Sequence, residues 1–397
     1  YQSQSILNIP ATLCAYFGAA PIHGEPLRPE IITPVEGDIQ RIILVLMDAL
    51  SLDRFTKWMR AGKIPVWNQL LKSGILAPIT SITPSTTSSA MTTLWTGQSP
   101  AEHGVAGYEL WLRQYGIVAN MISQSPMSFK GSIGSLERAG FNPDTELDMP
   151  KLGEYLRTQG VSTYSFQHYS IAYSGLSRTY LKDVTVVPFG TDAECWVNLR
   201  EVIERRKDDK LYLWTYWGSY DGLAHRYGPD DERAELYFTN FSQSLAYDFI
   251  DRLSPELRKG TLLILTADHG QVFTPKLPDF NLNNHPEFMN CLHIKPTGEN
   301  RLTYLHVKPG KESAMREYAA ETWPDQFILA NSKDLLDKGL FGPGNPMADF
   351  HNRIGDFIMI AKDHNYLWWS EEDNPLLGRH GGLTAQEMLV PYLAVRL

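Results

Sequence analysis

This sequence has few cysteines, no long hydrophobic run and no excess of basic side chains, and each of these features excludes a class of protein. The three cysteines, Cys14, Cys195 and Cys291, are odd in number and far apart, so neither a disulfide framework nor a C-x-x-C metal pair is expected. We therefore take the reducing cytoplasm as the default location. The longest apolar candidate, Ile42–Leu46, is far shorter than the roughly 18 residues of a membrane-spanning helix, so no membrane span is expected.

Net charge and the N-terminus add two further expectations. A formal net charge of −9 over 397 residues argues against a nucleic-acid polymer as partner, because such binding needs clustered Lys and Arg. Small phosphorylated substrates remain compatible, since a metal ion or a helix N-terminus reverses the field locally. No basic region precedes an apolar stretch at the N-terminus, so we expect no secretory signal, and a first residue other than Met leaves open a trimmed segment. Nothing in the sequence predicts the oligomeric state.

What the sequence does contain is an alternation of buried strands and helical segments. Three apolar, β-rich runs, 41–50, 211–217 and 261–270, each contain or lead to an Asp, and helical spacing lies between them. Strands that alternate with helices predict an α/β fold with a doubly wound, mostly parallel sheet flanked by helices.

Composition divides the chain into three parts. Residues 1–38 carry five prolines and predict an irregular N-terminal wrap. The core is expected to comprise 39–274 and 356–397. Between these two stretches, residues 275–355 predict a small α+β insert, because strand and helix patterns alternate there and clusters of Pro and Gly lie on both sides. We expect the main sheet to resume at 354–361.

Acidic and histidine side chains follow the predicted strands. Asp48, Asp221 and Asp268 lie at or just beyond three strand ends, which meet at one edge of a parallel sheet, where ligands bind. His225 is four residues after Asp221, so one helical turn places both on one face. His269 adjoins Asp268, and the two glycines after His380 allow close approach of the backbone. Taken singly, each residue is explained by a turn, a solvated helix face or a loop; together they predict a metal site.

A hydroxyl-rich segment, 82–97, completes this set. Its predicted helix begins near Thr86, Thr87 and Ser88, and a hydroxyl there either caps the helix or lies beside a phosphoryl group bound at the positive helix end. Three Asp and three His suit Zn²⁺, with Mn²⁺ or Fe as alternatives. These six side chains and the hydroxyl at the helix start make seven ligands, which fit two divalent ions better than one. Two ions can clamp the attacking and leaving oxygens of a phosphoryl displacement.

In this order, the segments resemble the alkaline phosphatase superfamily, and within it the type I phosphodiesterase and nucleotide pyrophosphatase branch. The resemblance covers roughly 41–385 through VLMDAL, PSTTSSAMTTLWTGQSPAEHGVAGY, DGLAHRYGP, TADHG and RHGGLT. It implies a metal-dependent phosphodiesterase core in which one ion is held by Asp221, His225 and His380 and the other by Asp48, Asp268 and His269. It further implies that Thr87 bridges to the second ion and attacks phosphorus, forming a phospho-threonine that water hydrolyses. Thr86 and Ser88 are the alternative nucleophiles.

Three positions concern substrate binding. The nucleotide-cleaving members carry an aromatic residue directly after the nucleophile and an Asn 21 residues after it; here these positions are Ser88 and Tyr108. Tyr216 falls where those members have a pocket tyrosine. We therefore take Ser88, Tyr108 and Tyr216 as candidate substrate contacts and leave nucleotide specificity open. His103, which also matches a motif position, is expected to support the loop rather than catalyse.

Two alternatives to a phosphodiesterase or pyrophosphatase remain. A phosphomonoesterase on the same scaffold would need an additional cation for the dianionic ester, and Arg379, Lys130 and Arg113 are the candidates. A solvated arginine is the simpler explanation for Arg379. The second alternative, a non-catalytic binding module, predicts the loss of at least one metal ligand, whereas all six are present.

Overall fold

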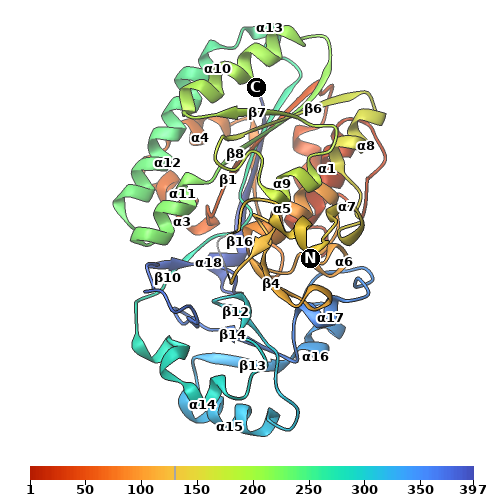
Figure 1. Cartoon of the computed structure of the whole chain (residues 1–397). Coiled ribbons are helices and arrows are strands. Elements are labelled where there is room, and N and C mark those ends of the chain that lie inside the picture. The colour runs from red at the N-terminus through yellow and green to blue at the C-terminus, as the bar shows by residue number, and fades with distance from the viewer. Residues whose placement is uncertain (129–130) are drawn as a thin grey trace.

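The computed structural model describes residues 1–128 and 131–397, and its largest element is a seven-stranded, mostly parallel sheet (Figure 1). Its order is β2 (Gly74–Thr80), β16 (Leu389–Arg396), β9 (Thr261–Thr266), β1 (Arg41–Met47), β8 (Lys210–Trp217), β6 (Val161–His168) and β7 (Thr185–Phe189). The five strands from β9 to β7 run parallel, and β16 runs antiparallel to both of its neighbours. The predicted α/β fold is confirmed.

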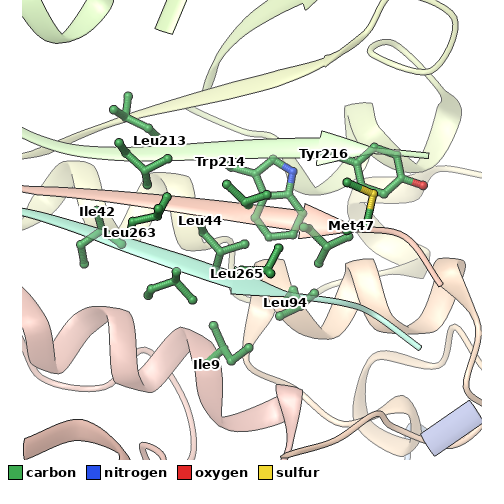
Figure 2. Packing of buried hydrophobic residues seen from close by; sticks show 14 of the residues in the cluster. Ile9, Ile42, Leu44, Met47, Leu94, Leu213, Trp214, Tyr216, Leu263 and Leu265 are labelled. Carbon is green, nitrogen blue, oxygen red and sulfur yellow. The ribbon is translucent and has the colours of Figure 1, made fainter. Parts of the chain in front are cut away.

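Helices cover both faces of this sheet, as an apolar central strand requires. One face carries α3 (Leu52–Arg60), α4 (Pro65–Leu70), α10 (Asp192–Arg205), α11 (Ser219–Tyr227) and α12 (Glu232–Ser244); the other carries α1 (Ile9–Tyr16), α5 (Thr87–Thr96), α8 (Leu152–Thr158) and α9 (Gly175–Tyr180). Every residue of β1 is buried, because its aliphatic side chains alternate between two covered faces. Figure 2 shows Leu44 and Leu265 of this core near Ile9 of α1 and Leu94 of α5.

A second, antiparallel seven-stranded sheet packs below the first (Figure 1). Its order is β13 (Phe327–Asn331), β14 (Phe357–Ala361), β12 (Leu302–Leu305), β11 (Thr297–Glu299), β3 (Glu109–Leu112), β4 (Ile117–Asn120) and β5 (Ser125–Pro126). Around it lie α14 (Pro286–Met289), α15 (Glu312–Thr322), α16 (Ser332–Asp337) and α17 (Phe350–Arg353). The remaining short elements are α2 (Pro29–Ile32), α6 (Pro100–His103), α7 (Pro143–Glu146), α13 (Pro255–Arg258), α18 (Ala385–Met388) and the paired β10 (Val272–Phe273) and β15 (Gly378–Arg379).

Two expectations need correction. The strand at 354–361 does not return to the main sheet; as β14 it pairs with β12 and β13, and β16 makes the return instead. Its apolar run is compatible with either sheet, so only the pairing partners decide. The N-terminal segment is also less irregular than expected, since Pro10 lies in the first turn of α1, where its missing N–H costs no helical bond. The boundaries of the proposed domains stay a prediction.

Among the described residues, no helix is both long and apolar enough to cross a bilayer.

Candidate metal centre

The parallel register of the central strands brings the predicted carboxylates to one edge. Leu46 of β1 lies opposite Tyr216 of β8 and Thr266 of β9, so the three strands end at the same level. Asp48 directly follows β1, and its N–H donates to the carbonyl oxygen of Trp217 at 3.1 Å. Asp268 follows β9 by two residues, and Asp221 lies in the first turn of α11, after β8. The structure thus places the three Asp where the strand pattern predicts.

Asp48, Asp268 and His269 form a buried cluster. The Nε2 atom of His269 lies 3.6 Å from Asp48 Oδ1 and 3.4 Å from Asp268 Oδ2, and the side chains are at most 3% exposed. Because His269 Nδ1 lies 3.0 Å from the carbonyl oxygen of Gly270, this nitrogen carries the proton and donates it, which leaves the lone pair of Nε2 directed at the carboxylates. The cluster therefore presents one neutral nitrogen and several carboxylate oxygens to a common point.

Two buried oxygens of this cluster, Asp48 Oδ1 and Asp268 Oδ2, have no hydrogen-bond partner among the described residues. Burial raises the pKa of Asp48 well above its usual value, and the charges of Asp268 and Asp221 raise it further. Burial also raises the pKa of Asp268. Crowded, buried carboxylates without a cation are unfavourable, so the unpaired oxygens and the free imidazole nitrogen fit a divalent metal ion. With both Asp and His as donors, the set suits zinc, manganese or iron.

Asp221, His225 and His380 form a second, half-exposed cluster, with one ligand atom of each within 4.8 Å of the others. His225 Nε2 lies 3.3 Å from Asp221 Oδ1. The Nδ1 atoms of His225 and His380 lie 2.8 Å from Gly378 O and 3.0 Å from Ser85 O, so each donates its proton there and keeps Nε2 free. Burial, followed by the neighbouring histidines, lowers the pKa of His380 well below its usual value.

The two clusters adjoin each other. Ligand atoms of Asp48, Asp221 and His269 also lie within 4.8 Å of one another, so Asp221 is close to both clusters. The rings of His269 and His380 stack, with centroids 3.8 Å apart. All six predicted ligands therefore converge on one region, as the expected grouping requires, and the structure adds that Asp221 lies between the two groups. Their roles as ligands stay a prediction.

The three candidate hydroxyls occupy different environments. Thr87 is the first residue of α5, and its Oγ1 lies 3.1 Å from His269 Nε2, beside both clusters. Thr86 precedes the helix in extended conformation, and its side chain hydrogen-bonds to Glu299. Ser88 Oγ has no hydrogen-bond partner in the part of the chain that the structure describes. The first helical bond of α5 runs from Ala90 N–H to Thr86 O, so within the described chain the N–H groups of Thr87, Ser88 and Ser89 have no helical acceptor and can bind an anion.

A cavity of about 360 Å³ opens beside Thr87. It is lined by Asp48, Thr87, Ser88, Met91, Ile122, Gln167, His168, Ser170, Ile171, Ser174, Leu176, Ser177, Tyr180, Tyr216, Gly218, Ser219 and Asp221. Tyr216 lines it as expected for a substrate contact, but its hydroxyl donates to Asp48 Oδ2. Tyr108 does not line it, and its hydroxyl accepts a hydrogen bond from Asn120 Nδ2 at 2.6 Å. Substrate contact by Ser88, Tyr108 and Tyr216 stays a prediction.

The candidate phosphate-binding cations lie elsewhere. Arg379 is neither solvated nor near the cavity: it is buried over the ring of Tyr366, at 3.8 Å from the centroid, and donates to Thr274 Oγ1 at 2.6 Å. Arg113 donates to Asn352 Oδ1 of α17, beside the second sheet. Lys130 lies outside the described residues. The expectation that Arg379 or Arg113 contacts phosphate is thus corrected. The sequence alone could not show that aromatic and polar side chains would enclose Arg379.

Several residues of the site were not anticipated. Glu299 at the end of β11 accepts the N–H of Tyr108 at 2.7 Å, and burial raises its pKa to about 8. Gln271 Nε2 donates to Asp221 Oδ1 at 2.5 Å. For Gln271 the adjacency to the TADHG segment was an available signal, whereas Glu299 lies in the predicted insert with no motif around it. As expected, His103 supports the loop after α6: its Nδ1 accepts the N–H of Val105 at 3.0 Å.

Comparison with known families agrees with this geometry. The sequence model of the family described as type I phosphodiesterase / nucleotide pyrophosphatase matches residues 42–383. That stretch contains the six candidate ligands and Thr87. No curated protein sequence shows a significant match.

Solved structures share the fold at low sequence identity. Murine ectonucleotide pyrophosphatase / phosphodiesterase 5 superposes with a TM-score of 0.65 at 17% identity, covering 90% of this chain and 88% of its own. An inactive form of the same mouse protein, solved with AMP, has a TM-score of 0.64 at 16% identity, with the same coverage. Phosphonoacetate hydrolase from Sinorhizobium meliloti 1021, in complex with phosphonoformate, has a TM-score of 0.63 at 17% identity, covering 89% of each chain.

Proposed function

The chain belongs to the type I phosphodiesterase / nucleotide pyrophosphatase family, and from this premise we propose a two-metal hydrolase that cleaves phosphodiester or pyrophosphate bonds through Thr87. The observation that carries the proposal is the position of Thr87 Oγ1, at the N-terminus of α5 and 3.1 Å from His269 Nε2, beside both ligand clusters. A threonine hydroxyl is a weak nucleophile by itself, so this placement is what gives it a catalytic role.

Two sets of residues would hold the metals. Asp221, His225 and His380 would hold one ion; Asp48, Asp268 and His269 would hold the other, with Thr87 bridging to it. Zn²⁺ is the first choice for these donors, with Mn²⁺ or Fe as alternatives. When bound, the ions would supply positive charge that activates the nucleophile and stabilises the developing negative charge on the phosphoryl oxygens and the leaving oxygen.

The chain itself supplies the nucleophile and orientation. Thr87 Oγ1 attacks phosphorus, and its proton passes to solvent as the new O–P bond forms; the bond to the leaving oxygen breaks, and that oxygen keeps the electron pair. Free N–H groups in the first turn of α5 hold the phosphoryl oxygens. Water then attacks the phospho-threonine and restores the Thr87 hydroxyl. The buried ring of His269, fixed through its Nδ1–H, keeps the geometry around Oγ1 constant between the two steps.

The substrate is proposed to be a small phosphorylated compound. The mouse relative that is crystallised with AMP supports a nucleotide as one candidate class. Among the described residues that line the cavity there is no Lys or Arg to match the second charge of a monoester, which favours diesters.

A direct test compares bis-p-nitrophenyl phosphate with p-nitrophenyl phosphate, using protein that has been stripped with a chelator and reloaded with Zn²⁺ or Mn²⁺. We expect the diester to be cleaved faster, and only by the reloaded protein. Faster cleavage of the monoester would favour the phosphomonoesterase alternative. Full activity of the stripped protein would contradict the metal assignment, and inactivity on nucleotide diesters and all other esters would favour a binding module.

A further inference from the structure

We propose that Ser88 selects the ester group of the substrate, by hydrogen bonding to an uncharged, hydroxyl-bearing organic group in the cavity beside Thr87. This inference rests on the proposed function and adds the chemical class of the group that the phosphoryl carries. Ser88 directly follows the nucleophile, so a ligand atom that it contacts lies close to the reacting phosphorus.

The hydroxyl of Ser88 is buried and unused within the chain. Its side chain has no exposed surface, its Oγ has no hydrogen-bond partner within residues 1–128 and 131–397, and the residue lines the cavity. The Ser88 carbonyl, by contrast, accepts the hydroxyl of Thr92 at 2.8 Å. A buried hydroxyl without a partner lowers stability, and a ligand atom in the cavity would remove this penalty.

Several other polar groups on the cavity wall are already engaged. Ser174 Oγ donates to Ser177 Oγ at 2.9 Å, and Gln167 Nε2 donates to Ser165 Oγ at 2.7 Å. His168 Nδ1 bonds with the Ser170 hydroxyl at 2.7 Å. Ser88 is therefore distinguished from these wall residues by a hydroxyl that is free for the ligand.

The remaining wall limits the ligand's charge. Met91, Ile122 and Leu176 supply apolar surface, and Asp48 and Asp221 are assigned to the metals. The described lining offers no Lys or Arg to an anionic group and no carboxylate beyond the metal ligands to a cationic one. Burying an unpaired charge there is unfavourable, so the wall favours a neutral ligand with an apolar body and a hydroxyl.

The test keeps the leaving group constant and varies the second ester group. We would measure release of p-nitrophenolate from the p-nitrophenyl phosphodiesters of 1,3-propanediol and of 1-propanol, which differ by one hydroxyl. The wild-type protein should prefer the hydroxypropyl ester by about five- to tenfold in kcat/KM, the effect of one hydrogen bond. The cationic ester p-nitrophenylphosphorylcholine should be cleaved more slowly than both.

Ser88→Ala should reduce the hydroxypropyl-to-propyl ratio to about one, as expected when one hydrogen bond is lost. Ser89→Ala is the matched control, because Ser89 lies in the same helix with an equally buried, unpartnered Oγ but does not line the cavity. It should keep the wild-type ratio. An unchanged ratio in Ser88→Ala, or no hydroxyl preference in the wild type, would overturn the inference.

Calorimetric binding of both esters to metal-loaded Thr87→Ala separates this inference from the proposed function. If the wild type cleaves neither ester while Thr87→Ala binds the hydroxypropyl ester more tightly, the proposed function fails and the role of Ser88 stands. Cleavage of both esters at equal rates, with equal binding to Thr87→Ala, leaves the function intact and rejects the role of Ser88.

Discussion

The two ligand clusters lie side by side but are built in different ways. Asp48, Asp268 and His269 follow the central strands and are at most 3% exposed, so sheet register fixes them. Asp221 and His225, on one turn of α11, are 17% and 23% exposed. They are completed by a loop residue, His380, that is anchored through Ser85 O.

This difference in burial predicts different tasks for the two clusters, one in turnover and the other in metal binding. Among the described residues, the buried cluster has carboxylate oxygens without a hydrogen-bond partner and contacts Thr87 directly, so on the proposed function a cation there would affect both folding and catalysis. The second cluster keeps partial contact with solvent through Asp221 and His225, so its desolvation penalty is smaller, and its geometry depends on the loop of His380. We therefore expect substitutions in the buried cluster to affect turnover most, and substitutions around the other cluster to affect mainly the affinity for its metal.

The largest effect should come from Thr87→Ala, which removes the hydroxyl adjoining the buried cluster. We expect kcat on a diester to fall at least about a thousandfold, because the substitution removes the proposed nucleophile. Metal content and the circular dichroism spectrum should stay unchanged. Thr86→Ala is the control, since that hydroxyl faces Glu299 rather than the cluster. Activity retained by Thr87→Ala and lost in Thr86→Ala would move the nucleophile to Thr86.

The next comparison sets His269→Gln against His225→Gln, the same change in the two clusters. Loss of the buried imidazole should lower kcat by about a thousandfold, since metal charge beside Thr87 stabilises the transition state by several kcal/mol. For His225→Gln we expect kcat to fall about tenfold at saturating metal. The second metal equivalent should also bind more weakly, as measured by titration with mass-spectrometric metal analysis. Equal losses of kcat in both variants would refute the division of tasks.

The sequence predicted the buried half better than the surroundings of the site. Asp48 and Asp268 follow apolar runs that alternate with helical segments, a pattern that predicts buried parallel strands, so their place at the sheet edge could be inferred. The strand β14 has the same apolar character, yet its sheet depends on partners distant in sequence, and we expected the wrong sheet. Glu299 and Arg379 were missed or misplaced for the same reason, because their environments are formed by long-range packing.

A third, smaller effect tests how the loop of His380 is held. Arg301, fully buried before β12, donates to both carboxylate oxygens of Glu387, which in turn accepts the N–H of Gly382 at 2.9 Å. Arg301→Met leaves this carboxylate buried and unpaired, so we expect a loss of stability of about 3–5 kcal/mol in urea unfolding. Because Gly382 is two residues from His380, we also expect weaker binding of one metal equivalent, by about tenfold.

The double substitution Arg301→Met with Glu387→Leu is the control for this third effect. It removes the unpaired charge and should recover most of the stability but not the metal affinity, since it also removes the carboxylate that accepts the N–H of Gly382. Recovery of both the stability and the metal affinity would show that the Arg301–Glu387 ion pair affects metal binding only through the stability of the fold. Loss of both metal equivalents would show that the two clusters are not independent.

The smallest expected effect concerns His103, a buried imidazole outside both clusters that serves as a reference for the histidines within them. Its Nε2 lies 3.1 Å from Thr93 Oγ1 and its Nδ1 accepts the Val105 N–H, so both nitrogens are used by the chain. Burial, and then the charge of Arg353, lowers the pKa of His103 to about 3. The folded chain therefore binds fewer protons at this site than the unfolded chain. The stabilisation is present above pH 6.5 and is lost as the pH falls toward about 3.

Between pH 7 and pH 5 this linkage should cost the protein about 2 kcal/mol of unfolding free energy. In His103→Gln, which cannot titrate, the decrease over the same interval should be smaller by about that amount, although the variant is less stable at pH 7. Urea unfolding of the chelated proteins measures this, because without metal the clusters titrate equally in both and cancel in the difference. Parallel pH dependences would place a protonated imidazole at position 103, incompatible with the acceptor role of Nδ1. His103 would then not serve as an example of a buried imidazole that stays neutral, as we expect for His380. The comparison of the two clusters would then depend on the measured metal affinities alone.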